Sequence, residues 1–153
     1  MLKMIQTRLS LSILCIKYLG GGLIVTTRKQ INDRIEAYAK AVRERIPEAV
    51  SELFAERFDH RVHGVGTDPG NPWNTKSVTD REGITRIYKD FFSNVADMAV
   101  EYTNRIIDTE CNSAAMVVRV KSGSVCMENA LHIMWDEEGK IIFFYNWYGQ
   151  CPG

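Results

Sequence analysis

Histidine side chains are the groups in this sequence best suited to acid–base chemistry, and the chain of 153 residues contains three of them. His132 lies in a stretch rich in branched and aromatic residues, whereas His60 and His63 lie close together in the motif HRVH. Because an imidazole titrates near neutral pH, a histidine in a partly desolvated pocket can move a proton to or from a carbon next to a carbonyl. His132 is the first candidate. The competing interpretations are a solvent-facing or interface histidine for His132 and surface loop histidines for the other two.

The histidine pair of HRVH does not have the arrangement of a metal site. His60 and His63 would lie on one side of a helix but on opposite sides of a strand, and no carboxylate is spaced to complete the ligand set. We therefore expect neither a metal nor another cofactor.

Large amphipathic side chains crowd into residues 130–149, ALHIMWDEEGKIIFFYNWYG, which read as two strands joined by a tight turn. Side chains with an apolar body and one polar atom suit a ligand cavity. Alternation separates each strand into two faces. Asn129 and Leu131 oppose His132 in the first strand, and in the second strand Phe144, Asn146 and Tyr148 oppose Tyr145 and Trp147. The sequence does not decide which face points inward.

Composition and charge fit one soluble domain. The content of 45% hydrophobic and 25% charged residues is that of an ordinary globular chain, and 19 basic residues balance 19 acidic ones. This balance disfavours nucleic acid and anionic membranes as partners. The four cysteines show no paired spacing, so we interpret them as reduced thiols in a cytoplasmic protein.

The first thirty residues contain the apolar run LSLSILCIKYLGGGLIV. A signal peptide is one interpretation, but Lys17 interrupts the run, GGG would weaken a helix, and no small-residue cleavage site follows. The run is also too short and broken to span a bilayer. We expect residues 1–29 to be a loosely attached N-terminal extension.

Two helices are predicted after this extension. Apolar residues recur at helical spacing from Ile31 to Val42, and Pro47 suits the first turn of a second helix whose apolar stripe extends to Phe58. The following stretch GVGTDPGNPWNTKS is a predicted loop. Its Trp73 is either a lid over a pocket or an anchor that pins the loop to the core.

A third helix and a set of strands complete the pattern. The motif TDRE predicts a capping box of Thr79 and Glu82 at the start of the third helix. Three segments after Val95, rich in branched and aromatic residues, predict four strands whose short connections favour an antiparallel meander. The segment DHRVHG is a candidate for a short fifth strand. Helices followed by strands indicate an α+β domain.

This order of elements, the pair FF in the third helix and the closing motif WDEEGKI resemble the nuclear transport factor 2-like superfamily. Its members include ketosteroid isomerases, SnoaL-like polyketide cyclases, scytalone dehydratase and limonene epoxide hydrolase. The resemblance implies a cone-shaped α+β barrel, with three N-terminal helices packed in a curved antiparallel sheet, a deep apolar pocket, and usually a homodimer through the sheet. It covers about residues 30 to 149, so we assign residues 30–150 to a SnoaL-like domain.

The resemblance also suggests roles for single residues. Tyr38 matches the tyrosine with which ketosteroid isomerases hydrogen-bond the steroid carbonyl, although it could equally be an ordinary core tyrosine. Val62 and Leu131 stand where those enzymes have acidic residues, which argues against their reaction here. SnoaL-like cyclases carry a histidine and an aspartate whose placement resembles that of His132 and Asn146, and asparagine in place of aspartate removes a base.

The leading hypothesis is a cofactor-independent isomerase, cyclase or dehydratase that acts by acid–base catalysis on an apolar carbonyl, hydroxyl or epoxide compound. Tyr38 or Asn146 would hold the oxygen, and His132 or His63 would transfer the proton. One alternative is a dimer that binds a hydrophobic ligand without catalysis, and another is a structural dimer whose cavity is filled by its own aromatic side chains. The remaining predicted pocket residues are Tyr145, Trp147, Tyr148, Phe144, Asn129, Leu131, Val62, His60, Trp73 and Phe91.

Overall fold

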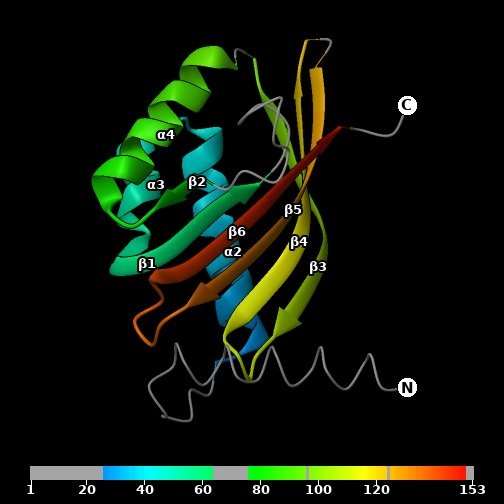
Figure 1. Ribbon diagram of the computed structural model, residues 1–153. Coiled ribbons are helices and arrows are strands. Elements are labelled where there is room, and N and C mark those ends of the chain that lie inside the picture. Colours follow the sequence, from blue (N-terminus) through cyan, green and yellow to red (C-terminus); the bar gives the residue numbers. More distant parts are fainter. Residues whose placement is uncertain (1–25, 64–75, 96, 124, 151–153) are drawn as a thin grey trace.

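The structure is a computed structural model that describes residues 26–63, 76–95, 97–123 and 125–150. The described elements follow one another as α2 (Arg28–Arg43), α3 (Pro47–Glu52), β1 (Phe54–His63), β2 (Lys76–Val78), α4 (Arg81–Asn94), β3 (Ala99–Asp108), β4 (Ser113–Ser122), β5 (Val125–Trp135) and β6 (Ile141–Gln150). The helices lie on one side of a curved sheet, and α2 runs across it (Figure 1). The α+β class predicted from the sequence is confirmed.

The sheet has six strands in the order β2-β1-β6-β5-β4-β3. The strands from β3 to β6 form the predicted antiparallel meander. However, β1 pairs with β6 in parallel, so the sheet is mixed rather than antiparallel. It is also an open sheet with β2 and β3 at its edges, and not the closed barrel that we expected.

The helices also differ from the prediction. The second helix, α3, ends at Glu52, and the apolar residues Phe54 and Phe58 that we assigned to it belong to β1. Two strands separate α3 from α4, so the described helices do not form an N-terminal group of three. The N-cap of α4 is Asp80, whose carboxylate accepts a hydrogen bond from the backbone amide of Gly83, and not the predicted Thr79.

Helix α2 forms the centre of the core. A capping box of Thr27 and Gln30 fixes its start. Its buried face carries Ile31, Ile35 and Tyr38, and it packs against the buried side chains of alternate sheet positions. Burial of such side chains contributes about 1.5–3 kcal/mol each. The space between α2, α4 and the inner sheet face is therefore where any internal pocket must lie.

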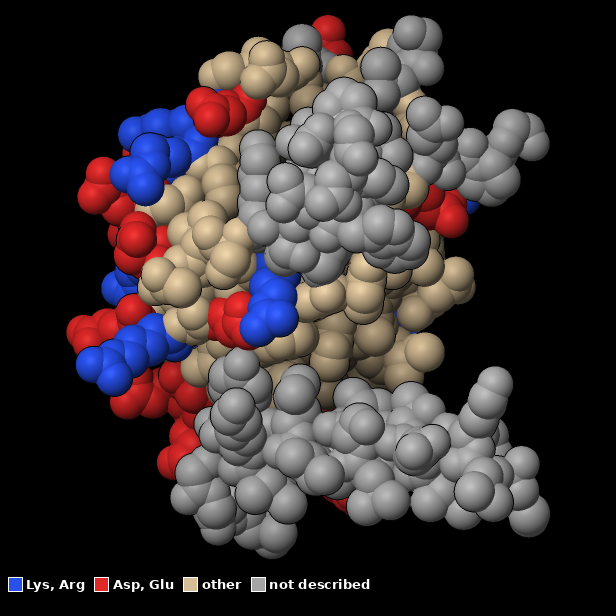
Figure 2. All heavy atoms as spheres, in the orientation of Figure 1, with Lys and Arg blue, Asp and Glu red and all other residues tan. Residues whose placement is uncertain are grey.

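The opposite face of the sheet carries a second, smaller cluster in which Met134, Ile142 and Phe143 are buried. Figure 2 shows charged side chains gathered along the helical side and mostly uncharged atoms over the strands. Within the described residues, no helix is both long and apolar enough to cross a membrane.

Cys111 and Cys126 are both disulfide-bonded. The interpretation of the cysteines as reduced thiols is therefore wrong for these two. Disulfides are typical of oxidising compartments, so the cysteines give no support to the predicted cytoplasmic location.

Candidate functional site

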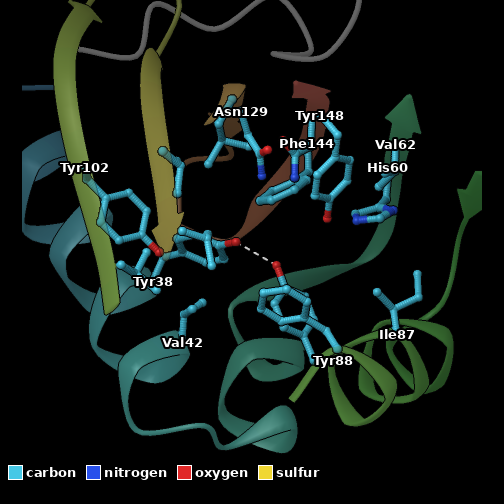
Figure 3. Close-up of a pocket in the computed structure, with 16 residues that line it drawn as sticks. Tyr38, Val42, His60, Val62, Ile87, Tyr88, Tyr102, Asn129, Phe144 and Tyr148 are labelled. Carbon is cyan, nitrogen blue, oxygen red and sulfur yellow. Dashed lines mark hydrogen bonds between the residues drawn. The ribbon is translucent and has the colours of Figure 1, made fainter. Parts of the chain in front are cut away.

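A pocket lies between the inner sheet face and helices α2 and α4, with a volume of about 50 Å³ (Figure 3). The helices contribute Tyr38, Val42, Ile87, Tyr88 and Phe91. The strands contribute His60, Val62, Val100, Tyr102, Val118, Val120, Asn129, Leu131, Phe144, Asn146 and Tyr148. Small-molecule sites are commonly about 300–1,000 Å³ in volume. The deep apolar pocket that we expected is therefore not shown, because aromatic rings fill most of the space.

His60 is the described histidine that lines the pocket wall. It lies on β1 and is 1% exposed, and its ring stacks on Phe144 with the centroids 5.1 Å apart and an interplanar angle of 15°. The centroid of the Phe54 ring lies 6.1 Å from that of the His60 ring. Burial lowers the pKa of His60 to about 4, although the nearby Asp59 carboxylate favours the protonated form. The imidazole is thus neutral at pH 7, and its Nδ1 has no hydrogen-bond partner in the described structure.

Two tyrosines from different helices face the same space. The hydroxyl oxygens of Tyr38 on α2 and Tyr88 on α4 lie 2.6 Å apart and share a hydrogen bond. Burial, followed by the proximity of the other phenols, raises the pKa of Tyr38, and burial also raises the pKa of Tyr88. One hydroxyl of the pair donates to the other, which leaves the second proton available to an oxygen in the pocket.

Two asparagines add unpaired polar atoms. Asn129 on β5 and Asn146 on β6 have buried amide oxygens without a hydrogen-bond partner in the described part of the chain. Their strands are neighbours in the sheet, and Asn146 is paired in register with Leu131. A buried polar atom without a partner costs about 1–3 kcal/mol, so such atoms are uncommon in native interiors.

Nine of the residues predicted for the site line this pocket. They are Tyr38, His60, Val62, Phe91, Asn129, Leu131, Phe144, Asn146 and Tyr148. The structure also adds Tyr88, which the prediction of the site omitted. The signal was present in the sequence, because Tyr88 follows Ile84 at the spacing of one helical turn on the buried face of α4.

His132, Tyr145 and Trp147 lie on the opposite, outer face of the sheet. His132 and Trp147 line a separate groove of about 280 Å³ there, and the ring of Tyr145 stacks on that of Phe143. Burial lowers the pKa of His132, and Asp108 opposes this effect. His132 therefore cannot act on a molecule in the inner pocket.

Two further predicted residues cannot be placed. The backbone of His63 ends β1 and pairs with Trp147, but the His63 side chain lies outside the described residues, as does Trp73. Within the described ranges, no group of three or more histidine, cysteine or acidic side chains is placed to hold a metal ion.

No protein-family profile matches this chain, and no curated protein matches it. Among solved structures, this chain is similar to a protein of unknown function with a cystatin-like fold from Methylobium petroleophilum PM1. The TM-score is 0.67 at 14% identity, and the comparison covers 84% of this chain and 82% of the other. It is also similar to a candidate ketosteroid isomerase from Kribbella flavida DSM 17836, with a TM-score of 0.60, 18% identity, and coverage of 82% of each chain.

A third similar structure is the epoxide hydrolase/cyclase-like enzyme SalBIII, which has a role in pyran ring formation in the polyether salinomycin. Its TM-score is 0.60 at 15% identity, with 79% of this chain and 92% of SalBIII covered. At these identities the similarity concerns the fold alone. An NTF-2 like protein of unknown function from Burkholderia xenovorans LB400 is also similar, with a TM-score of 0.63, so the nuclear transport factor 2-like fold predicted from the sequence is confirmed.

Proposed function

We propose that the inner pocket binds a small neutral molecule through a carbonyl or hydroxyl oxygen and that His60 moves a proton on its carbon skeleton. The protein would then be a cofactor-independent acid–base enzyme of the isomerase, dehydratase or cyclase type. His60 takes the role for which the sequence suggested His132 or His63, because it is the described histidine that lines the inner pocket.

One observation carries this proposal. The three buried side-chain atoms without a hydrogen-bond partner in the described structure are Nδ1 of His60 and the amide oxygens of Asn129 and Asn146. They come from three different strands, and all three residues line the same pocket. Unpaired polar atoms gathered around one space favour a site for a ligand with hydrogen-bonding groups over an ordinary core.

The chemistry follows from the charges that the interior tolerates. Burial keeps His60 neutral and keeps the phenols of Tyr38 and Tyr88 protonated. Nδ1 of His60 can accept a proton from a carbon next to a carbonyl while a tyrosine hydroxyl donates to the carbonyl oxygen. The proton taken up makes His60 positive, and the proton given up makes the tyrosine negative. Because the two charges arise together, neither stands as a lone ion in a site of low polarity. Return of the proton from His60 to another carbon, together with return of the enol proton to the tyrosine oxygen, would complete an isomerisation.

Exchange of the methyl protons of acetone for deuterium tests this step, with acetone as a small model ketone followed by NMR. We expect the purified protein to accelerate exchange and His60→Gln to lower the acceleration by at least about 100-fold. His132→Gln, on the outer face, is the matched control and should retain it. Equal activity of the wild type and His60→Gln, or an equal loss in both variants, would contradict the assignment of His60.

A second candidate function is binding without turnover. Among the described residues that line the pocket there is no aspartate or glutamate, so the wall lacks the carboxylate that is a common catalytic base. Acetone that shifts the NMR signals of His60 without any acceleration of exchange would favour this second function.

We also propose that two copies associate through the outer sheet face. Its groove is lined by apolar side chains that include Ile106, which is 72% exposed, and Ala130, which is also exposed. An exposed apolar surface of this kind is typical of an interaction site. In a symmetric pair, the same face of the second copy would cover these apolar side chains.

A further inference from the structure

We infer that Tyr148 determines the size of the molecule that the inner pocket accepts, because its ring occupies part of the space that the body of a larger substrate would need. This inference rests on the proposed function, since it concerns the specificity of the same site.

Tyr148 lies in the pocket and not beside it. Its ring extends from β6, and its hydroxyl points to the space between His60 and the hydrogen-bonded pair of Tyr38 and Tyr88 (Figure 3). Electrostatic coupling is consistent with this position, because the Tyr148 phenol helps to raise the pKa of both tyrosines of the pair. The remaining free volume is only about 50 Å³. An apolar cavity that holds a benzene molecule is about 150 Å³, so a cyclic ligand does not fit beside the ring of Tyr148.

The hydroxyl of Tyr148 makes no hydrogen bond with another described residue, in contrast to the paired hydroxyls of Tyr38 and Tyr88. Within the described part of the chain, no hydrogen bond therefore holds the ring in its inward position. A larger ligand can displace the ring at small cost in hydrogen bonding.

The backbone under this side chain is fixed. Tyr148 is paired in register with Asn129, and a side chain at the adjacent Gly149 would stand only 2.9 Å from the carbonyl oxygen of Glu128. The neighbouring strand thus leaves little room for the chain to shift. The ring of Tyr148 can therefore leave the pocket only by rotation of its side chain. A small substrate fits beside the ring, whereas a larger substrate must cause this rotation.

The test measures the affinity of three ketones of increasing size, acetone, cyclohexanone and 1-tetralone, by NMR titration of the His60 ring signals. We expect Tyr148→Ala to bind 1-tetralone at least tenfold more tightly than the wild type does. The affinity for acetone should change by less than threefold. Tyr148→Phe, which keeps the ring and removes the hydroxyl, should retain the size preference of the wild type.

The possible outcomes separate this inference from the proposed function. A ratio of 1-tetralone to acetone affinity that is the same in Tyr148→Ala and the wild type would overturn the role of Tyr148 alone. The absence of any response of His60 to any ketone, in every variant, would contradict the proposed function as well. Tyr148→Leu, measured together with thermal unfolding of each variant, provides a second test of ring size if Tyr148→Ala does not fold.

Discussion

His60 combines two properties that usually exclude each other, burial in the core and an unpaired polar atom. Its stacking on Phe144 and its burial are properties of a core residue, whereas its unpaired Nδ1 is a property of a functional one. A purely structural histidine at 1% exposure would normally have a hydrogen-bond partner for each ring nitrogen. The position therefore costs folding stability, and this cost has a measurable dependence on pH.

We predict that the stability of the protein falls between pH 6.5 and pH 4 in a manner that depends on His60. In the unfolded chain the imidazole has its ordinary pKa of about 6.5, whereas in the folded protein the pKa is about 4. The unfolded state thus binds a proton that the folded state excludes, and the free energy of unfolding decreases as pH falls through this window. A shift of this size corresponds to about 3 kcal/mol.

Urea denaturation of the wild type and of His60→Gln at several pH values between 4 and 7 measures this contribution. The decrease on acidification should be about 3 kcal/mol smaller in the variant. The comparison cancels the titration of His132, whose pKa burial also lowers, and that of the carboxylates. Parallel pH dependence of the two proteins would contradict the buried, neutral state of His60.

The sequence separated the two faces of the last hairpin correctly but could not assign them. Alternation grouped Asn129 with Leu131 and opposed both to His132, and the structure keeps these groups. Both faces are rich in aromatic residues, so hydrophobicity did not distinguish the inner face from the outer one. The choice depends on which face meets α2, and that contact is made by residues about ninety positions earlier in the chain.

At the scale of elements, a buried asparagine links three parts of the fold. Asn112, in the connection between β3 and β4, donates from its amide nitrogen to the carbonyl oxygens of Trp135 and Asp136 at 2.8 and 2.9 Å. Its amide oxygen accepts from Arg34 of α2 at 2.7 Å. Asn112 thereby joins α2 to the β3–β4 connection and to the β5–β6 turn, which lie at the same end of the sheet.

We predict that Asn112→Ala lowers the free energy of unfolding by about 3 kcal/mol, because it leaves buried carbonyl groups without a donor. The backbone of Asn112 has a φ of 48°, which also disfavours alanine. Asn112→Gly separates the two effects, since glycine tolerates this φ, and should cost about 1 kcal/mol less than alanine. Chemical denaturation measures all of these values.

The control for this series is Asn94→Ala, because the exposed side chain of Asn94 makes only a local hydrogen bond to Asp90 within α4. Its expected cost is below about 0.5 kcal/mol. Equal costs at Asn112 and Asn94 would show that the buried network contributes nothing.

The start of α4 offers a test of a helix cap that the sequence placed one residue too early. The carboxylate of Asp80 accepts from the amide of Gly83 at 2.6 Å. We expect Asp80→Ala to lower the free energy of unfolding by about 1 kcal/mol and Thr79→Ala to change it by less than about 0.5 kcal/mol. A larger loss for Thr79→Ala would restore the capping box predicted from TDRE.

The error at α3 has a similarly local origin. Phe54 and Phe58 are four residues apart, a spacing that places side chains on one face of a helix and also on one face of a strand. The helical repeat of about 3.6 residues and the strand repeat of two residues could not be distinguished over so short a segment. His60 continues the strand period and lies on the same inner face, and it is the base in the proposed function.

For the whole molecule, local signals predicted the meander and missed the mixed sheet. The strands from β3 to β6 are joined by short turns, which favour antiparallel neighbours. The pairing of β1 with β6 joins segments about eighty residues apart, such as His60 and Phe144. No local pattern encodes such a contact, yet it brings His60 beside the asparagines of β5 and β6. This wall of the pocket therefore depends on a parallel pairing that the sequence did not predict.

The outer face of the same sheet leads to the last prediction, which concerns assembly. If two copies associate through this face, a charge at its centre must be desolvated on association and opposes it. We expect Ala130→Glu and Ile106→Glu each to raise the dimer dissociation constant at least tenfold, as measured by analytical ultracentrifugation. Both positions are exposed in the single chain, so the thermal unfolding temperature at concentrations below the dissociation constant should change little.

Glu137→Lys, an exposed charge change on the turn between β5 and β6, is the control and should leave association unaltered. A wild-type protein that remains monomeric at high micromolar concentration would contradict the proposed dimer.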